Sequence, residues 1–185
     1  DSSSIRHSLA IAEQPTRGEM EYLFYRDRPA DIFLSINDID EKFIKNFKFL
    51  LISGASLSQS PVSEAVMLAI EYAKRNQVKI VFDPDYRKSN WNSITEASLY
   101  YAMVARKSDI IFGTREELNV VEYIYNKDNT DDLKTAESLF DFNPSIVCIK
   151  HGEQGSVLYN KNGESIKHGI CPARVHKTLG AGDSF

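Results

Sequence analysis

Short apolar runs alternate with amphipathic segments over most of this chain. Four apolar runs have the length of strands, at 49–52, 78–82, 109–112 and 145–150. The first is apolar throughout and is expected to be buried on both faces. Apolar residues at helical spacing predict helices over 39–47, 60–74, 94–106, 114–124 and 131–141. Strands that alternate with helices in this way are typical of a parallel sheet covered by helices on both faces.

The pattern changes towards both ends of the chain. Residues 1–19 are polar and irregular, whereas the run from Glu19 to Arg26 alternates well enough to predict a strand. Beyond Gly155, two apolar stretches separated by a turn at 161–163 predict a β-hairpin added to the sheet. Ser60 and Pro61 are expected to begin the helix over 60–74, as its N-cap and first residue.

Composition narrows the class of protein. The chain has 185 residues, with 42% hydrophobic and 26% charged residues, which suits one globular domain. The net charge of −4 argues against nucleic acid or an anionic membrane as a partner. No apolar run approaches the roughly 20 residues that a membrane helix needs. Cys148 and Cys171 lie in separate strand-like segments and are expected to be buried free thiols of a cytoplasmic protein.

The chemistry concentrates in the stretch from Lys177 to Phe185, K-T-L-G-A-G-D-S-F. Glycines at 180 and 182 let a ligand approach the main chain, and the first N–H groups of a helix beginning there would bind anionic oxygens. Asp183 would repel such an anion, but it can accept the proton of a hydroxyl that attacks it. The stretch therefore predicts a phosphoryl-transfer site. A glycine-rich turn with Asp183 as a helix N-cap remains the alternative.

Polar residues follow several predicted strands, where ligands of open α/β sheets bind. In Asp83-Pro84-Asp85-Tyr86-Arg87, the Arg87 guanidinium can meet a phosphate or a carboxylate, and a local ion pair is the alternative. Thr114 and Glu117 have the spacing of a capping box.

Two further strand ends carry candidate residues. Lys150 is followed by a turn with glycines at 152 and 155, and the intervening His151 is expected to be a solvated loop residue. Tyr25 and Arg26 close the strand over 19–26, where Arg26 can pair with a carboxylate.

The stretch 177–185 resembles the D-T-x-G-A-G-D-x-F motif of the ribokinase-like, or phosphofructokinase-B type, carbohydrate kinases, with Lys177 in place of the first Asp. The resemblance implies a three-layer α/β/α sandwich with a mainly parallel central sheet plus a C-terminal β-hairpin. It implies that Asp183 is the catalytic base and that Gly180, Ala181 and Gly182 form the anion hole. The segment 83–87 is similar to the D-x-N-x-R motif of the acid-sugar members, with Asp85 where Asn is usual.

The same resemblance assigns the remaining candidates. Glu117 matches the family's Asn-x-x-Glu and would hold Mg²⁺ through water, whereas Thr114 replaces the Asn. Lys150, Gly152 and Gly155 would lie by the nucleotide. Tyr25 and Arg26, together with Arg87 and Asp183, would contact the substrate.

The implied reaction is phosphorylation of the terminal hydroxyl of a sugar acid by ATP and Mg²⁺. The acceptor expected first is 5-dehydro-2-deoxy-D-gluconate of myo-inositol breakdown. The alternatives are 2-keto-3-deoxygluconate, fructose, and a non-catalytic sugar-binding relative. Residues 1–185 are expected to be part of a domain that extends beyond both ends, with 19–36 near a substrate-side lid and 48–185 as the α/β core. Assembly into a homo-oligomer stays open.

Overall fold

The computed structural model describes residues 7–13, 21–25 and 28–172, and the chain divides into two compact units. One unit comprises residues 1–31 and 170–185, and the other residues 32–169. In the first unit, β1 (Leu9–Glu13) pairs antiparallel with β2 (Glu21–Tyr25). The strand expected over 19–26 is confirmed for 21–25. The expectation that 1–19 is irregular is wrong for Leu9–Glu13, where apolar residues alternate with small ones over a very short run.

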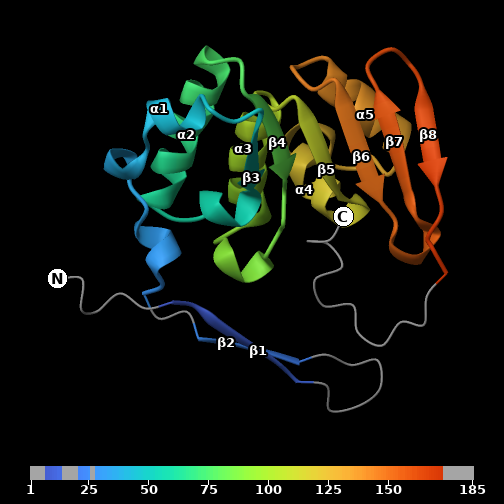
Figure 1. Cartoon of the computed structure of the whole chain (residues 1–185). Helices are drawn as coiled ribbons and strands as arrows, with labels where there is room; N and C mark the ends of the chain where they lie inside the picture. The colour runs from blue at the N-terminus through green and yellow to red at the C-terminus, as the bar shows by residue number, and fades with distance from the viewer. Residues whose placement is uncertain (1–6, 14–20, 26–27, 173–185) are drawn as a thin grey trace. The chain divides into compact units, whose positions relative to one another are not determined.

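The second unit is built on a six-stranded sheet in the order β3-β4-β5-β6-β7-β8 (Figure 1). Four strands are parallel: β3 (Phe49–Ser53), β4 (Lys79–Asp83), β5 (Ile110–Thr114) and β6 (Ile146–Lys150). The hairpin of β7 (Ser156–Asn160) and β8 (Ser165–His168) adds two antiparallel strands beside β6. The mainly parallel sheet with an added hairpin, predicted from the sequence, is confirmed.

Helices occupy the connections between the strands. They are α1 (Glu41–Ile44), α2 (Val62–Arg75), α3 (Ile94–Ala105), α4 (Arg115–Asn126) and α5 (Asp132–Phe140). Short 3₁₀ turns lie at Ala30–Phe33, Ile36–Asp38, Gly54–Leu57, Lys88–Asn90 and Gly152–Gln154. The helix expected over 39–47 is only one turn long. The expectation that Ser60 is the N-cap and Pro61 the first residue of the next helix is wrong. That helix begins at Val62, and Pro61 is its N-cap, where its ring provides no oxygen to cap the backbone.

The helices pack on one face of the sheet (Figure 1). Each connection between parallel strands leads to the next strand of the sheet, always in the same direction across it. Because such crossovers are right-handed, the helices that they contain lie on the same face. Ile52, Phe82 and Ile111 point to that side and are buried. On the opposite face Phe49 and Leu51 are 56% and 62% exposed, so the expectation that their strand is buried on both faces is wrong. A second helical layer is not found among residues 32–169.

Two other expectations concern single features. Cys148 is a buried free thiol, as predicted, but Cys171 is exposed and lies outside any strand, so the expectation for Cys171 is wrong. Within the described ranges, no helix has both the length and the apolar character needed to cross a membrane.

Candidate functional site

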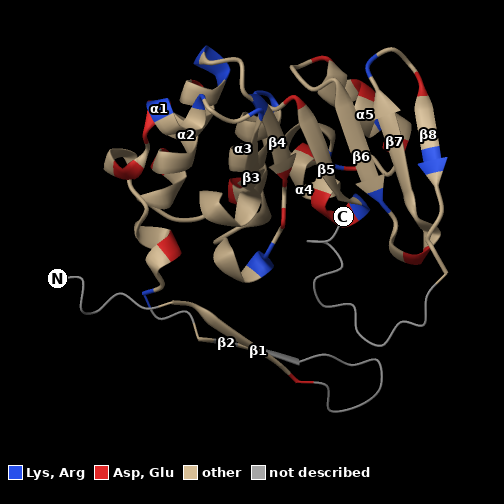
Figure 2. Ribbon diagram, in the orientation of Figure 1, with Lys and Arg blue, Asp and Glu red and all other residues tan. Residues whose placement is uncertain are grey.

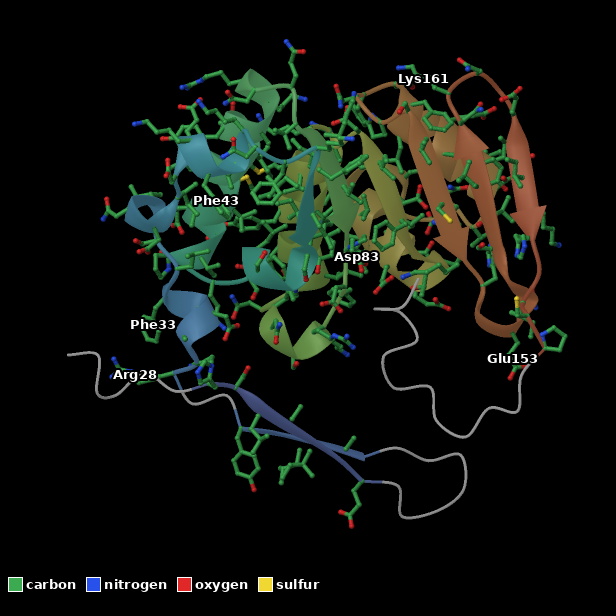
Figure 3. The ribbon with its side chains drawn as sticks, viewed as in Figure 1. Arg28, Phe33, Phe43, Asp83, Glu153 and Lys161 are labelled. Carbon is green, nitrogen blue, oxygen red and sulfur yellow. The ribbon has the colours of Figure 1, made fainter. Side chains whose placement is uncertain are left out.

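The carboxyl ends of the parallel strands gather the polar residues that the sequence singles out. Ser53 pairs with Asp83 at the ends of β3 and β4, and Thr114 pairs with Lys150 at the ends of β5 and β6. Figure 2 shows acidic and basic residues together where these strands end. In Figure 3, Asp83 and Glu153 lie at this end of the sheet and Lys161 lies at the other. This edge is therefore the candidate site of the second unit.

The segment after β4 folds back against the end of β3. The Ser53 hydroxyl donates to Asp85 Oδ2 at 3.1 Å, and the Asp85 N–H donates to Asp83 Oδ1 at 3.3 Å. Gly54 makes this approach possible, because a Cβ there would overlap the carbonyl oxygen of Pro84. The turn is strained at Asp85, whose φ is +37°.

Arg87 is bonded to its own segment. Its Nη2 lies 2.8 Å from Asp85 Oδ1, which is the local ion pair that the sequence left as an alternative. The Arg87 side chain is 68% exposed, so this pair is open to solvent and weakly held. The guanidinium therefore keeps donors on the solvent side that an anionic ligand can reach.

Asp83 is a further candidate residue, to which the sequence assigned no role although it begins the Asp83–Arg87 segment. Burial raises the pKa of its carboxyl, and the Lys150 ammonium counteracts part of that rise. The neighbouring carboxylates of Glu117 and Asp85 raise the Asp83 pKa further. Its position directly after a buried strand was the available indication. The burial and two of the three charged neighbours, Lys150 and Glu117, come from other segments of the chain.

Thr114 and Glu117 form the predicted capping box at the start of α4. The Thr114 N–H donates to Glu117 Oε2 at 2.7 Å, and the Glu117 N–H donates to Thr114 Oγ1 at 3.2 Å. One oxygen of Glu117 is thus held by the backbone, which suits contact with a metal through water better than direct ligation. The described residues contain no cluster of three or more His, Cys, Asp or Glu that could hold a metal.

The turn after β6 has the conformation that its glycines allow. Gly152 and Gly155 have φ of +55° and +87°, and within the described part of the chain a Cβ at Gly152 would meet nothing within 4 Å. The His151 N–H donates to the Gly155 carbonyl at 2.8 Å and closes the turn. Lys150 ends the strand before it, with Nζ 5.3 Å from the centre of the Phe112 ring. A cation and an open backbone turn at one strand end can meet the phosphates of a nucleotide.

His151 also belongs to a buried polar network that the sequence analysis missed. Its Nε2 lies 2.7 Å from Asp132 Oδ2, and its side chain is only 25% exposed, so the expectation of a solvated loop residue is wrong. Arg115 bridges Asp132 and the buried Glu122, at 3.2 Å and 2.6 Å. Most of these pairs join residues on separate elements, and no local pattern indicates them.

Several expected site residues fall elsewhere. Two groups of expected residues lie outside the described part of the chain. They are Arg26, and the glycine-rich motif with Lys177, Gly180, Ala181, Gly182 and Asp183. Tyr25 ends β2 in the first unit and is 54% exposed. The described part of the site is therefore the edge formed by Asp83–Arg87, Thr114–Glu117 and Lys150–Gly155.

Comparison with known proteins agrees with this architecture. A 5-dehydro-2-deoxygluconokinase of Geobacillus kaustophilus (strain HTA426) is 46% identical over 185 residues, which is 100% of this chain and 55% of that protein. The chain thus spans little more than half the length of this curated relative.

Solved structures share the fold at low sequence identity. A Xylella fastidiosa fructokinase with bound ATP superposes with a TM-score of 0.84 at 15% identity, over 98% of this chain and 55% of that one. An E. coli protein assigned as ribokinase II, in complex with ATP and Mg²⁺, gives a TM-score of 0.76 at 23% identity, over 90% and 52%. The model of the pfkB family of carbohydrate kinases matches residues 2–185, and the chain belongs to that family.

Proposed function

We propose that the intact protein transfers the γ-phosphoryl group of ATP to the terminal hydroxyl of a sugar acid, 5-dehydro-2-deoxy-D-gluconate. The observation that carries this proposal is the 46% identity, over all 185 residues, to the Geobacillus kaustophilus protein named 5-dehydro-2-deoxygluconokinase. The guanidinium of Arg87 at the carboxyl edge of the sheet is consistent with an acceptor that carries a carboxylate. The protein would act in the cytoplasm on a small molecule, in the breakdown of myo-inositol.

In this proposal Asp183 takes the proton of the acceptor hydroxyl as its oxygen attacks the γ-phosphorus. The bond from phosphorus to the bridging oxygen then breaks and ADP leaves. The N–H groups of Gly180, Ala181 and Gly182 stabilise the charge on the equatorial oxygens, as the family motif implies. Tyr25 and Arg26 of the 19–36 segment would contact the sugar from a substrate-side lid.

The nucleotide would lie over the turn at Gly152–Gly155, with Lys150 facing its phosphates. Gly152 fits this role, since no atom of the described residues lies within 4 Å of where its Cβ would be. Bound Mg²⁺ would neutralise part of the phosphate charge. Glu117 would contact that ion through water, because its Oε2 accepts the Thr114 N–H. The ATP and Mg²⁺ complex of the E. coli protein supports both ligands.

Fructose is the second candidate acceptor, supported by the fold shared with the Xylella fructokinase. A panel of sugar acids and neutral sugars, assayed by ADP release from the intact protein, separates the two. We expect kcat/KM for 5-dehydro-2-deoxygluconate to exceed that for fructose by about tenfold or more. Fructose has no carboxylate, so its binding would desolvate the Arg87 guanidinium without giving it a charged partner. Comparable values for fructose would remove the sugar-acid assignment.

The role of Arg87 can be read from the same panel. If Arg87 binds the carboxylate, Arg87→Ala lowers kcat/KM for the acid more than for fructose. If it binds the transferring phosphate, both substrates lose activity equally. Lys88→Ala removes a neighbouring cation of the same segment and serves as the matched control.

The Asp183→Asn variant, compared with the wild type, tests whether the protein is an enzyme with Asp183 as its base or a non-catalytic sugar-binding relative. A general base contributes about 10²–10⁴ in rate, so kcat should fall by that factor while ATP affinity stays nearly unchanged. A variant that keeps more than about a tenth of the wild-type kcat would show that Asp183 is not the base. Wild-type protein that binds sugar without forming ADP would instead favour the non-catalytic relative.

A further inference from the structure

A buried polar network connects the candidate nucleotide segments of the second unit. At its centre Glu122, on α4, is 1% exposed and accepts from Arg115 Nη2 at 2.6 Å. The Thr135 hydroxyl of α5 lies 2.9 Å from Glu122 Oε1. Arg115 Nη1 also donates to Thr135 Oγ1 at 2.9 Å and pairs with Asp132 at 3.2 Å. The network therefore joins the start of α4 firmly to α5.

Asp132 extends this network to the turn after β6. Its Oδ1 faces Arg115 and its Oδ2 lies 2.7 Å from His151 Nε2, so one carboxylate bridges two elements. A carboxylate accepts hydrogen bonds, and Nε2 must therefore carry the proton in this pair. Asp132 and His151 are 80% and 75% buried, so water competes weakly for the bond.

The ends of the network border the proposed nucleotide contacts. Arg115 directly follows Thr114, and His151 lies between Lys150 and Gly152 in the chain. The hydrogen bonds within the turn join only residues 151–155 to one another, and so they set its local shape. The hydrogen bond between His151 and Asp132 ties this turn to the helix layer through a side chain.

We propose that His151 is a positioning residue for the nucleotide. By donating to Asp132, it holds the Gly152–Gly155 turn in place relative to Thr114 and the start of α4. The inference rests on the proposed use of ATP and concerns a residue to which that function assigns no role. His151 acts through Asp132 and the turn, and the phosphoryl group is transferred without its direct participation.

The test is equilibrium binding of ATP to the intact protein by calorimetry, together with steady-state kinetics. Loss of a charge-assisted hydrogen bond that holds a binding turn should weaken ATP binding by about tenfold. His151→Ala should therefore raise the Kd and KM for ATP by that factor, with kcat and the sugar KM changed less than about twofold. His151→Gln should restore ATP binding, because its amide N–H can reach the position of the imidazole Nε2–H.

Two further variants locate the effect. In an Asp132→Ala background, His151→Ala should produce no additional loss of ATP affinity, since the bond is already absent. Lys107→Ala breaks an exposed ion pair of 2.6 Å with Glu71, away from the turn, and should leave the Kd for ATP unchanged.

The possible outcomes distinguish this inference from the proposed function. Wild-type affinity in His151→Ala, a loss that His151→Gln does not restore, or additive losses with Asp132→Ala would each overturn the positioning role. If the wild type binds ATP but phosphorylates no sugar, the proposed function fails, while the binding comparison still decides the role of His151. A wild type that does not bind ATP overturns both.

Discussion

Gly155 provides a direct test of how the turn after β6 meets the added hairpin. Its φ and ψ are +87° and −141°, a region that residues with a Cβ rarely occupy. A Cβ there would overlap the carbonyl oxygen of His168 and come within 2.8 Å of the Gly169 Cα. Gly155→Ala is therefore opposed by both backbone conformation and packing.

The two costs can be separated with a second glycine. Gly163, in the β7–β8 turn, has the same φ of +87°, but no described residue lies within 4 Å of where its Cβ would be. A positive φ costs alanine about 1–3 kcal/mol, and the ψ of −141° places Gly155 at the unfavourable end of that range. The overlap at Gly155 adds a further 1–3 kcal/mol or so, by analogy with overpacked sites. The entropy that alanine removes from the unfolded chain is the same in both variants and cancels.

Urea unfolding of the intact protein, followed by circular dichroism, measures the difference. We expect Gly155→Ala to lower the free energy of unfolding by about 1–3 kcal/mol more than Gly163→Ala does. The slope m should be unchanged, so that the shift in midpoint reports stability alone. If the two variants agree within about 0.5 kcal/mol, the contact between Gly155 and the His168 carbonyl is not the constraint that the structure indicates.

Three other predictions concern buried groups. Glu122→Ala leaves Arg115 half-paired in the network, and the free energy of unfolding in urea should fall by about 3 kcal/mol; a loss below about 1 kcal/mol would contradict this. Because burial raises the pKa of Asp83, the folded protein holds that proton more tightly than the unfolded chain. Ionisation of Asp83 therefore destabilises the fold as pH rises above the ordinary value of 3.8. Asp83→Asn should remove this loss and raise the urea midpoint near pH 7, and an unchanged midpoint would refute it. Iodoacetamide at about pH 8 should label Cys171 before Cys148 in peptide mass spectra, because Cys148 is buried and burial raises its thiol pKa. Equal labelling rates would contradict that order.

The elements of the second unit were predictable because their determinants are local. A buried parallel strand is a short apolar run, a surface helix repeats its apolar residues every three or four positions, and both patterns can be read without knowing neighbours. The capping box of Thr114 and Glu117 was predictable for the same reason, since its partners are three residues apart. The short strand β1 was missed because five residues of weak alternation resemble an irregular segment.

Local patterns along the chain are enough to predict the order and type of most elements, the added hairpin, and the strand ends that carry polar residues. How those residues are bonded and buried follows from the folded unit. Only the fold buries Asp83 among charges, pairs His151 with Asp132, and leaves Phe49 and Leu51 exposed on the face opposite the helices. These features depend on strand register and on helix packing between residues distant in the chain. Such contacts are set by the packing of the whole unit, and no periodic pattern along the chain records them.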